Sequence, residues 1–350
     1  MTGVLLHLTT AVEWRAALTG GVLRPPSLPE AGFVHLSDPG QVHLPAARLF
    51  PGRRDVVVLV VDPTRLTDPV RYEPGVPGDP ASMRFPHLYG PLPCPAVVAV
   101  LPWRVDRPLD LPAPDDAAAR AAALALSLPV RRAAQVTDVP GGLAVTGPPS
   151  ARSQAEDQLL LTAVVGADEV EERTAQLAAD HGWPAPAATL LHPGAAPVAE
   201  ELGRRGWTVA PVVVLAHRSP SPAASGDGDG VVHPPDAQRP RGGPPQVERD
   251  RTDRVVRVLD VVVGDGGAGV PAGQLLVDGG TAELVGVTSA PDAGDDRAAE
   301  AVVDRALALA VEAGCDLVVL AVGASAELPR WCGRLGFTEV GRRIDVHRPA

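Results

Sequence analysis

The 350-residue chain contains no lysine, and it has few aromatic residues and few cysteines. Because lysine is absent, arginine carries every positive charge apart from those on histidine, and the formal net charge is −11. A general nucleic-acid-binding protein needs a clustered positive surface, so this charge balance argues against one. Aromatic residues make up only 3% of the chain, and its cores must therefore consist mainly of Val, Leu and Ala.

The scarcity of cysteine and of long apolar runs limits where the protein can work. Cys94, Cys315 and Cys332 are far apart, and none belongs to a CxxC pair. This pattern excludes a disulfide framework and favours a reducing compartment. No apolar run approaches the roughly 20 residues of a membrane helix, and the first residues lack the basic segment of a signal peptide. We therefore expect a cytoplasmic protein that binds neither membrane nor nucleic acid.

Proline and glycine are abundant, with 39 and 36 residues, and their distribution suggests the domain organisation. They are dense in residues 219–253, where the Pro, Gly, Ser and charge content predicts a disordered linker. The overall pattern predicts an α/β (α+β) protein. Its expected parts are a domain at 1–106, a connector with a short helix at 107–128, a unit at 129–218, the linker, and a last unit at 254–350.

Apolar periodicity predicts the main elements of each part. In the first part we expect strands at 4–8, 55–61 and 97–101, and helices at 11–18 and 41–50. In the second unit we expect strands at 158–165, 187–191 and 209–216, and helices at 169–181 and 199–205. In the last unit we expect strands at 255–263, 282–288, 317–322 and 344–347, with a long helix at 297–313.

The two later units resemble each other in sequence. The string LGRRGWTV, which begins at Leu202, matches CGRLGFTE, which begins at Cys332. Gly333 follows Gly203 by 130 residues, and the same offset relates the predicted helices and strands of the two units. A shared offset over several elements indicates a duplication. We predict two copies of one strand–helix–strand–helix–strand order, with a longer loop after the first of these strands in the second copy.

Residues 280–322, followed by WCGRLGFTEVG, resemble a GCN5-related N-acetyltransferase (GNAT). That family has a strand, a phosphate-binding loop, a long helix, a strand and a short helix in this order. The resemblance covers residues 255–348, and residues 129–218 resemble the degenerate first lobe of two-lobed members. It implies tandem acyl-CoA N-acyltransferase-like lobes that use acetyl-CoA to acetylate an amine. The acceptor, a small molecule or a protein amine, stays open.

The resemblance also assigns cofactor-binding residues. Val285 and Val287 would offer strand backbone to the pantetheine, while Arg297 and Ala299 lie on the phosphate loop. Free N–H groups at the start of the following helix would favour the pyrophosphate. The sequence departs from the family here, because Arg297 replaces the glycine that lets a phosphate approach the backbone. Aspartates at positions 292, 295 and 296 add negative charge beside it.

Two catalytic candidates belong to the same unit. Cys332 occupies the position where the family often has a tyrosine as general acid, and Glu283 is a candidate general base on the strand. Two alternatives to catalysis by these residues remain open. The lobes could form a scaffold or ligand-binding protein that has lost catalysis, or the chemistry could belong to the first domain.

In the first domain, three histidines stand in apolar strings: VLLHLTT, GFVHLS and RFPHLYG. A single buried histidine is usually structural, but His7, His35 and His87, with Ser37 and Tyr89 beside them, favour a shared pocket. A zinc site of three histidines is the rival interpretation, although the sequence has no HxH or HxxH pair among them.

These strings resemble the domain-of-unknown-function family 952 over residues 1–105. That family is similar to the ADP-ribosyltransferase fold, in which a histidine on the first strand holds the nicotinamide ribose of NAD. The resemblance therefore implies an ADP-ribosyltransferase-like N-terminal domain with NAD as its ligand. His7 would take the first-strand role, His35 with Ser37 would match the second-strand motif, and His87 or Tyr89 the third.

Overall fold

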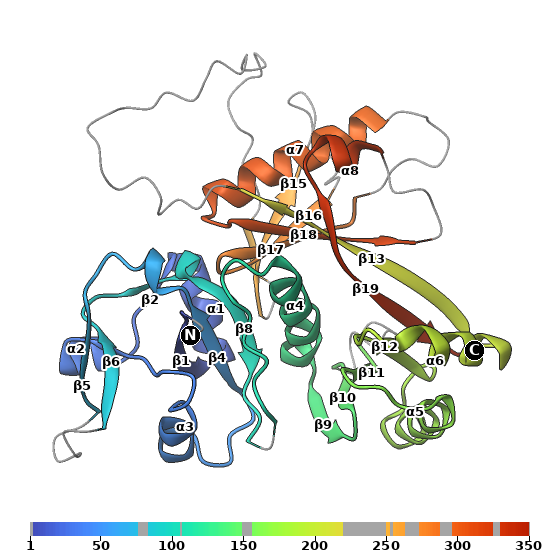
Figure 1. Ribbon diagram of the computed structural model, residues 1–350, viewed down its shortest axis with the longest axis horizontal. Helices are drawn as coiled ribbons and strands as arrows, with labels where there is room; N and C mark the ends of the chain where they lie inside the picture. Colours follow the sequence, from blue (N-terminus) through green and yellow to red (C-terminus); the bar gives the residue numbers. More distant parts are fainter. Residues whose placement is uncertain are drawn as a thin grey trace.

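The structure is a computed structural model that describes residues 3–75, 83–105, 107–148, 156–219, 250–252, 255–262, 273–287, 296–324 and 330–349. The fold is mixed α+β. A small N-terminal unit stands beside one large, mostly antiparallel sheet, and helix α4 (Ala117–Arg132) lies between them (Figure 1). Within the described residues, no helix is both long enough and apolar enough to cross a membrane.

The N-terminal unit contains two three-stranded sheets. The first sheet orders β1 (Leu5–Thr10), β4 (Val56–Val61) and β8 (Val97–Pro102), all antiparallel. The second orders β3 (Val34–His35), β6 (Arg84–Leu88) and β5 (Val70–Pro74). The smaller elements are β2 (Val22–Leu23), β7 (Leu92–Pro93), α2 (Ser27–Ala31), α3 (His43–Leu49) and the 3₁₀ turns Pro63–Arg65 and Cys94–Ala96.

Helix α1 (Ala11–Gly20) begins at the predicted residue and ends two residues after the predicted end. Thr10 accepts a hydrogen bond from the backbone N–H of Glu13, and the Glu13 carboxylate accepts one from the backbone N–H of Thr10. This reciprocal pair satisfies donors that the first helical turn leaves open. Gly21 ends the helix with φ 74°, a left-handed conformation that glycine adopts without steric cost.

The large sheet has 11 strands among the described residues, in the order β14-β15-β16-β17-β18-β13-β19-β12-β11-β10-β9. The first lobe supplies β9 (Gln135–Val139), β10 (Gly142–Thr146), β11 (Gln158–Leu161), β12 (Ala187–Leu190) and β13 (Thr208–Arg218). The second supplies β14 (Asp250–Thr252), β15 (Arg257–Val261), β16 (Gly273–Asp278), β17 (Thr281–Val285), β18 (Leu317–Gly323) and β19 (Thr338–His347).

Apart from β14, the strand order is symmetric about the centre of the sheet, because β9 to β13 of the first lobe correspond in turn to β15 to β19 of the second. Helix α5 (Ala167–His181) connects the parallel strands β11 and β12, and α7 (Asp296–Glu312) connects the parallel strands β17 and β18 in the same way. The short helices α6 (Ala195–Arg204) and α8 (Arg330–Arg334) then precede β13 and β19. The duplication predicted from the 130-residue offset is therefore confirmed by the topology.

The last strand of each lobe pairs with the other lobe. β13 of the first lobe lies between β18 and β19, and β19 of the second lobe lies between β13 and β12. The β13–β19 pair is the seam of the pseudo-symmetric sheet, and the long diagonal strands of Figure 1 are these two. Because each lobe completes the sheet of the other, the two lobes form one structural unit.

Several predicted elements need correction. α4 is a helix of 16 residues rather than a short connector helix, and the predicted boundary between residues 128 and 129 falls inside it. β14 lies within the predicted linker, whose residues 220–249 lie outside the described part of the chain. β9, β10 and β16 were missed. β17 ends at Val285, because Gly286 turns the chain with φ 72°.

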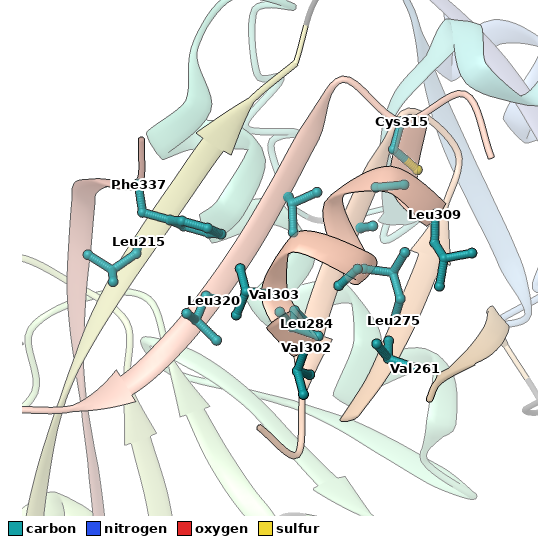
Figure 2. Packing of buried hydrophobic residues seen from close by; sticks show 14 of the residues in the cluster. Leu215, Val261, Leu275, Leu284, Val302, Val303, Leu309, Cys315, Leu320 and Phe337 are labelled. Carbon is teal, nitrogen blue, oxygen red and sulfur yellow. The ribbon is translucent and has the colours of Figure 1, made fainter. Parts of the chain in front are cut away.

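Helix α7 covers one face of the second lobe. Figure 2 shows Val302, Val303 and Leu309 of the helix pointing toward Leu275, Leu284 and Leu320 of the strands. Since successive strand residues point to opposite faces, Ala282 and Leu284 of β17 enter this core while Glu283 and Val285 face the other side. That opposite face is where the cavity described below lies.

Candidate functional site

A cavity of about 800 Å³ lies on the face of the large sheet opposite α7. Leu124 and Leu128 of α4 line it from one side. Strands of both lobes line it from the other, because the joined sheet presents a continuous face there. The polar side chains at its wall are Arg132, Gln158, Thr189, Gln274, Glu283, Arg343, Asp345 and His347. This volume suits a small-molecule site.

Glu283 is a carboxylate at the wall of this cavity, and its surroundings shift its pKa. Burial raises the pKa of Glu283, and the positive charges of Arg343 and Arg132 oppose that rise. A carboxylate with a raised pKa is a better proton acceptor than an exposed glutamate. The geometry therefore places the predicted base in a cavity, which the sequence alone did not reveal.

Beside Glu283, the two parallel strands of the second lobe stop pairing. The β17–β18 ladder runs from Thr281 opposite Leu317 to Leu284 opposite Leu320. β18 continues to Gly323 with β13 on its other edge, whereas β17 ends one residue later, at Val285. The strand backbone from Val285 onward is therefore not paired with β18, at the place where the sequence resemblance puts the pantetheine.

The phosphate end of the predicted acyl-CoA site is described only in part. Val287 is half-buried and packs against the core under α7. Arg297 lies in the first turn of α7, and Ala299 has its methyl group in the core with 3% of its surface exposed. Ala299 could therefore meet a phosphate only through its backbone. The loop aspartates at 292 and 295 lie outside the described residues.

Cys332 does not face the cavity. It lies in α8 with 3% of its surface exposed, in the core that also contains Val303, Trp331 and Phe337. The cavity wall does not include it. A thiol packed among apolar side chains is poorly placed to protonate a leaving thiolate, so this burial argues against the predicted acid role. Val303 comes from α7, a distant part of the chain, so this packing could not be read from the sequence.

A second cavity, of about 640 Å³, lies in the N-terminal unit. His7, His35 and Ser37 line it together with apolar side chains that include Leu44 and Phe85. Nδ1 of His7 lies 2.7 Å from the backbone oxygen of His35. Because a carbonyl oxygen only accepts, Nδ1 must carry the proton and Nε2 is left as an acceptor. Burial lowers the pKa of His7, which favours this neutral form.

His87 and Tyr89 lie behind this cavity rather than in its wall. The His87 ring stacks on Phe33 with centroids 3.9 Å apart and meets the His35 ring edge-on at 5.0 Å. Tyr89 donates a hydrogen bond of 2.6 Å to Glu73, whose carboxylate is also 3.4 Å from Nδ1 of His87. The predicted histidines therefore form one cluster, but only His7 and His35 reach the cavity.

Glu73 was not identified as part of this cluster, although it precedes FPHLYG in the sequence. It comes close because β5 pairs with β6, with Glu73 opposite Phe85. In the described part of the chain, no three His, Cys, Asp or Glu side chains gather in a way that could hold a metal ion. The alternative zinc site thus has no described ligand set.

The comparisons with known proteins match the N-terminal unit and the remainder of the chain separately. Residues 8–100 match the model of a family described as "Protein of unknown function (DUF952)". The solution NMR structure of CC0527 from Caulobacter crescentus is 32% identical, covering 30% of this chain and 90% of that protein, with a TM-score of 0.26. Over residues 8–100, the chain belongs to the DUF952 family. The similarity of this N-terminal domain to the ADP-ribosyltransferase fold stays a prediction, and so does its use of NAD.

The remainder of the chain is similar to solved acetyltransferase structures. A GCN5-related N-acetyltransferase from Kribbella flavida is 17% identical, covering 67% of this chain and 96% of that one, with a TM-score of 0.42. A GCN5-related N-acetyltransferase from Sphaerobacter thermophilus is 16% identical, covering 61% and 83%, with a TM-score of 0.32. A comparison with curated proteins found no match. The functional argument below therefore rests on the strand order and cavity of this chain.

Proposed function

We propose that this protein is an N-acyltransferase of the GNAT type, which binds acetyl-CoA in its C-terminal lobe and transfers the acetyl group to an amine. One observation carries the proposal. The strand–helix–strand unit β17–α7–β18 stops pairing after Leu284 and Leu320, and Glu283, with its raised pKa, lies beside this point at the wall of the large cavity. Unpaired strand backbone can hold the amides of a pantetheine arm, and the cavity can hold the acceptor.

In this mechanism the chain supplies a base and an orientation. Glu283 takes a proton from the acceptor ammonium group, and the freed amine attacks the thioester carbonyl carbon. The C–N bond forms as the C–S bond breaks, and the new amide nitrogen releases its second proton to solvent. The thiolate of CoA takes up a proton from solvent, because Cys332 is buried in the core. Backbone N–H groups after Leu284 orient the thioester. Holding both reactants in one cavity supplies much of the rate enhancement.

The phosphate end of the site should bind weakly. The N-terminus of a helix contributes only about 0.3–1 kcal/mol to an anion at an exposed end. A like-charge pair at about 4 Å costs roughly 1 kcal/mol even in water, and three aspartates stand near Arg297 in the sequence. If Arg297 replaces the lost loop contacts, Arg297→Gly weakens acetyl-CoA binding. If Arg297 blocks the site, the same substitution strengthens it.

Isothermal titration with acetyl-CoA tests the proposal directly. We expect measurable binding by the parent chain and by Glu283→Gln, because Glu283 acts on the amine and not on the nucleotide. Turnover with amines should be lost only in Glu283→Gln. Absence of binding at millimolar acetyl-CoA, both in the parent and in Arg297→Gly, would reject the acyltransferase and leave the lobes as a scaffold.

A second, separate candidate is NAD binding by the N-terminal cavity. The observation in its favour is the Nε2 atom of His7, which is buried, accepts hydrogen bonds, and has no hydrogen-bond partner within the described residues. Such an atom suits a ligand hydroxyl, as on a ribose. Calorimetric titration of the parent and of His7→Ala with NAD tests it. Equal heats for the two proteins would remove His7 from the proposal, and no heat from the parent would remove NAD.

A further inference from the structure

We propose that the acceptor is a small primary amine that also carries a carboxylate, bound with its amine toward Glu283 and its carboxylate toward Arg343. This inference rests on the proposed acetyl transfer, because it names the class of substrate for the same cavity. It comes from the distribution of charge around the cavity wall.

Four charged side chains from three different elements face this cavity, among them Asp345, which lies two residues after Arg343 on β19. Glu283 comes from β17, Arg343 from β19 and Arg132 from the last residue of α4, and all three are half-buried. The two arginines act on the Glu283 carboxylate, since their charges oppose the effect of its burial on the pKa. A bound molecule in the cavity therefore meets two carboxylates, Glu283 and Asp345, and two cations, of which Arg343 is paired with Asp345.

Arg343 is the cation with donor capacity left for a ligand. Its Nε atom is buried and has no hydrogen-bond partner in the described parts of the chain. The neighbouring acid, Asp345, lies 3.5 Å from that Nε, which is longer than an ordinary N–H···O bond. Asp345 accepts a hydrogen bond of 2.9 Å from the Thr189 hydroxyl instead.

Two arginines at the junction of the units, Arg120 and Arg65, show how an arginine with a structural role is held here. Arg120 donates to Asp316, to Thr281 and to the backbone oxygens of Gly280 and Pro114. Arg65 donates to Asp316, Asp62 and the backbone oxygen of Pro95. Within the described residues, Arg343 has only the 3.5 Å ion pair with Asp345. A guanidinium with open donors in a cavity matches a carboxylate, which accepts two parallel N–H bonds.

The spacing of the strands favours a compact molecule. β17 and β19 are separated in the sheet by β18 and β13. Neighbouring strands lie about 4.8 Å apart, so the two strand axes are roughly 14 Å apart before the side chains reach inward. The charge of Arg343 nevertheless acts on Glu283, so one compact molecule in the cavity can contact both side chains. Helix α4 lines the cavity opposite the sheet.

The test compares amino acids with the amines that they yield on decarboxylation. The pairs are phenylalanine and phenethylamine, tyrosine and tyramine, histidine and histamine, and lysine and cadaverine. Release of the CoA thiol is followed with a thiol-reactive dye, using the full chain and saturating acetyl-CoA. At least one amino acid should show a kcat/KM about tenfold or more above that of its decarboxylated partner, as expected for a hydrogen-bonded charge pair.

Two variants of Arg343 and one variant of its neighbour Arg342 complete the experiment. Arg343→Gln should raise KM for the preferred amino acid about tenfold or more and leave its decarboxylated partner nearly unchanged, while Arg343→Lys should recover part of the loss. Arg342→Gln is the matched control, because Arg342 is exposed, pairs with Glu339 and does not line the cavity. Thermal unfolding of each variant checks that the fold is kept.

The possible outcomes separate this inference from the proposed function. If calorimetry detects no acetyl-CoA binding, the acyltransferase proposal itself fails. If acetyl-CoA binds but decarboxylated amines react as well as amino acids, or Arg343→Gln leaves the ratio within each pair unchanged, the carboxylate proposal is wrong and the acyltransferase stands. Binding of acetyl-CoA without acetylation of any amino acid in the panel also overturns the carboxylate proposal.

Discussion

Arg120 of α4 donates to both carboxylate oxygens of Asp316, with N···O distances of 2.8 Å in each case, and both side chains are almost completely buried. The same carboxylate accepts two more hydrogen bonds, of 2.8 and 2.7 Å, from Arg65 of the N-terminal unit. Asp316 directly precedes β18. One side chain thus joins the DUF952 domain, helix α4 and the second lobe of the large sheet.

Nearby contacts strengthen the same junction. The backbone N–H of Gly280 donates to Val97 at 2.7 Å, and the Thr281 hydroxyl donates to the backbone oxygen of Val98 at 2.8 Å. The indole of Trp14 donates to Asp278, which also pairs with Arg131. The junction holds β17 and β18 at their first residues, and the strands stop pairing at the other end. We infer that the N-terminal unit positions the strands on which the proposed acyl-CoA site depends.

Asp316→Asn should strongly destabilise the protein. The substitution removes the negative charge and leaves the guanidinium groups of Arg120 and Arg65 buried without it. Breaking a buried ion pair in this way typically costs about 3–5 kcal/mol. Urea unfolding followed by circular dichroism measures the change. Glu339→Gln, at an exposed pair with Arg342, is the control and should change the stability little. Equal stabilities of the two variants would contradict the structural role of Asp316.

The same carboxylate should make the protein sensitive to acid. Burial acts to raise the pKa of Asp316, but hydrogen bonds and charge from Arg120 and Arg65 outweigh it and hold the pKa well below the ordinary 3.8. A group with a depressed pKa stabilises the folded protein fully at pH values above its ordinary pKa. That stability declines as the pH falls below the ordinary pKa toward the depressed pKa of the folded protein. Unfolding free energies measured from pH 6 down to about pH 2 should therefore decline more steeply in the parent than in Asp316→Asn. Parallel curves would show that Asp316 does not carry this dependence.

The junction can also be tested through its backbone. Gly279 and Gly21 both have positive φ, at 76° and 74°, so alanine at either position costs about 1–2 kcal/mol of strain. A Cβ atom at Gly279 would lie 2.5 Å from the backbone oxygen of Val97, whereas one at Gly21 meets nothing within 4 Å. Gly279→Ala should therefore lose more stability than Gly21→Ala in urea unfolding. If the two losses are equal, the close approach of the domains at Gly279 does not contribute.

The repeat and its elements could be predicted from sequence because they depend on local signals. The 130-residue offset, the apolar face of α7 and the cap at Thr10 lie within short stretches of chain. Exchange of the last strands between lobes could not be predicted, because β13 and β19 read as ordinary apolar strands and their partners are chosen by the completed sheet. β9, β10 and β16 were missed since their short segments lie among glycines and prolines.

In the candidate sites, too, some features could be predicted from local sequence, whereas others depend on tertiary packing. Glu283 was identified from its strand, but the cavity around it forms only when α4, predicted as a minor connector, packs against both lobes. Arg343 and Arg132 were not identified, since nothing local distinguishes them from the neighbouring arginines Arg342 and Arg131. For Cys332, alignment with a family position placed a thiol in a catalytic role, while three-dimensional packing placed it in the core.

The proposed base gives a pH dependence whose direction follows from its surroundings. Because burial raises the pKa of Glu283 above the ordinary 4.5, the carboxylate loses its proton at a higher pH than a free glutamate. The rate of acetyl transfer should therefore rise with pH, with a midpoint above 4.5. The amine of the acceptor titrates higher, at about 7.7–8.0 for an α-amino group or about 10.4 for a lysine side chain, so the two limbs of the profile can be separated.

Glu283→Gln should remove the lower limb and reduce kcat by a factor of about 10²–10⁴, the usual contribution of a general base. The substitution keeps the shape and hydrogen-bonding capacity of the side chain but cannot take the proton. Binding of acetyl-CoA should be unchanged, which distinguishes loss of the base from loss of the fold. A Glu283→Gln profile with the lower limb intact would show that another group accepts the proton, and the role would then pass to Asp345 or His347, which also line the cavity wall.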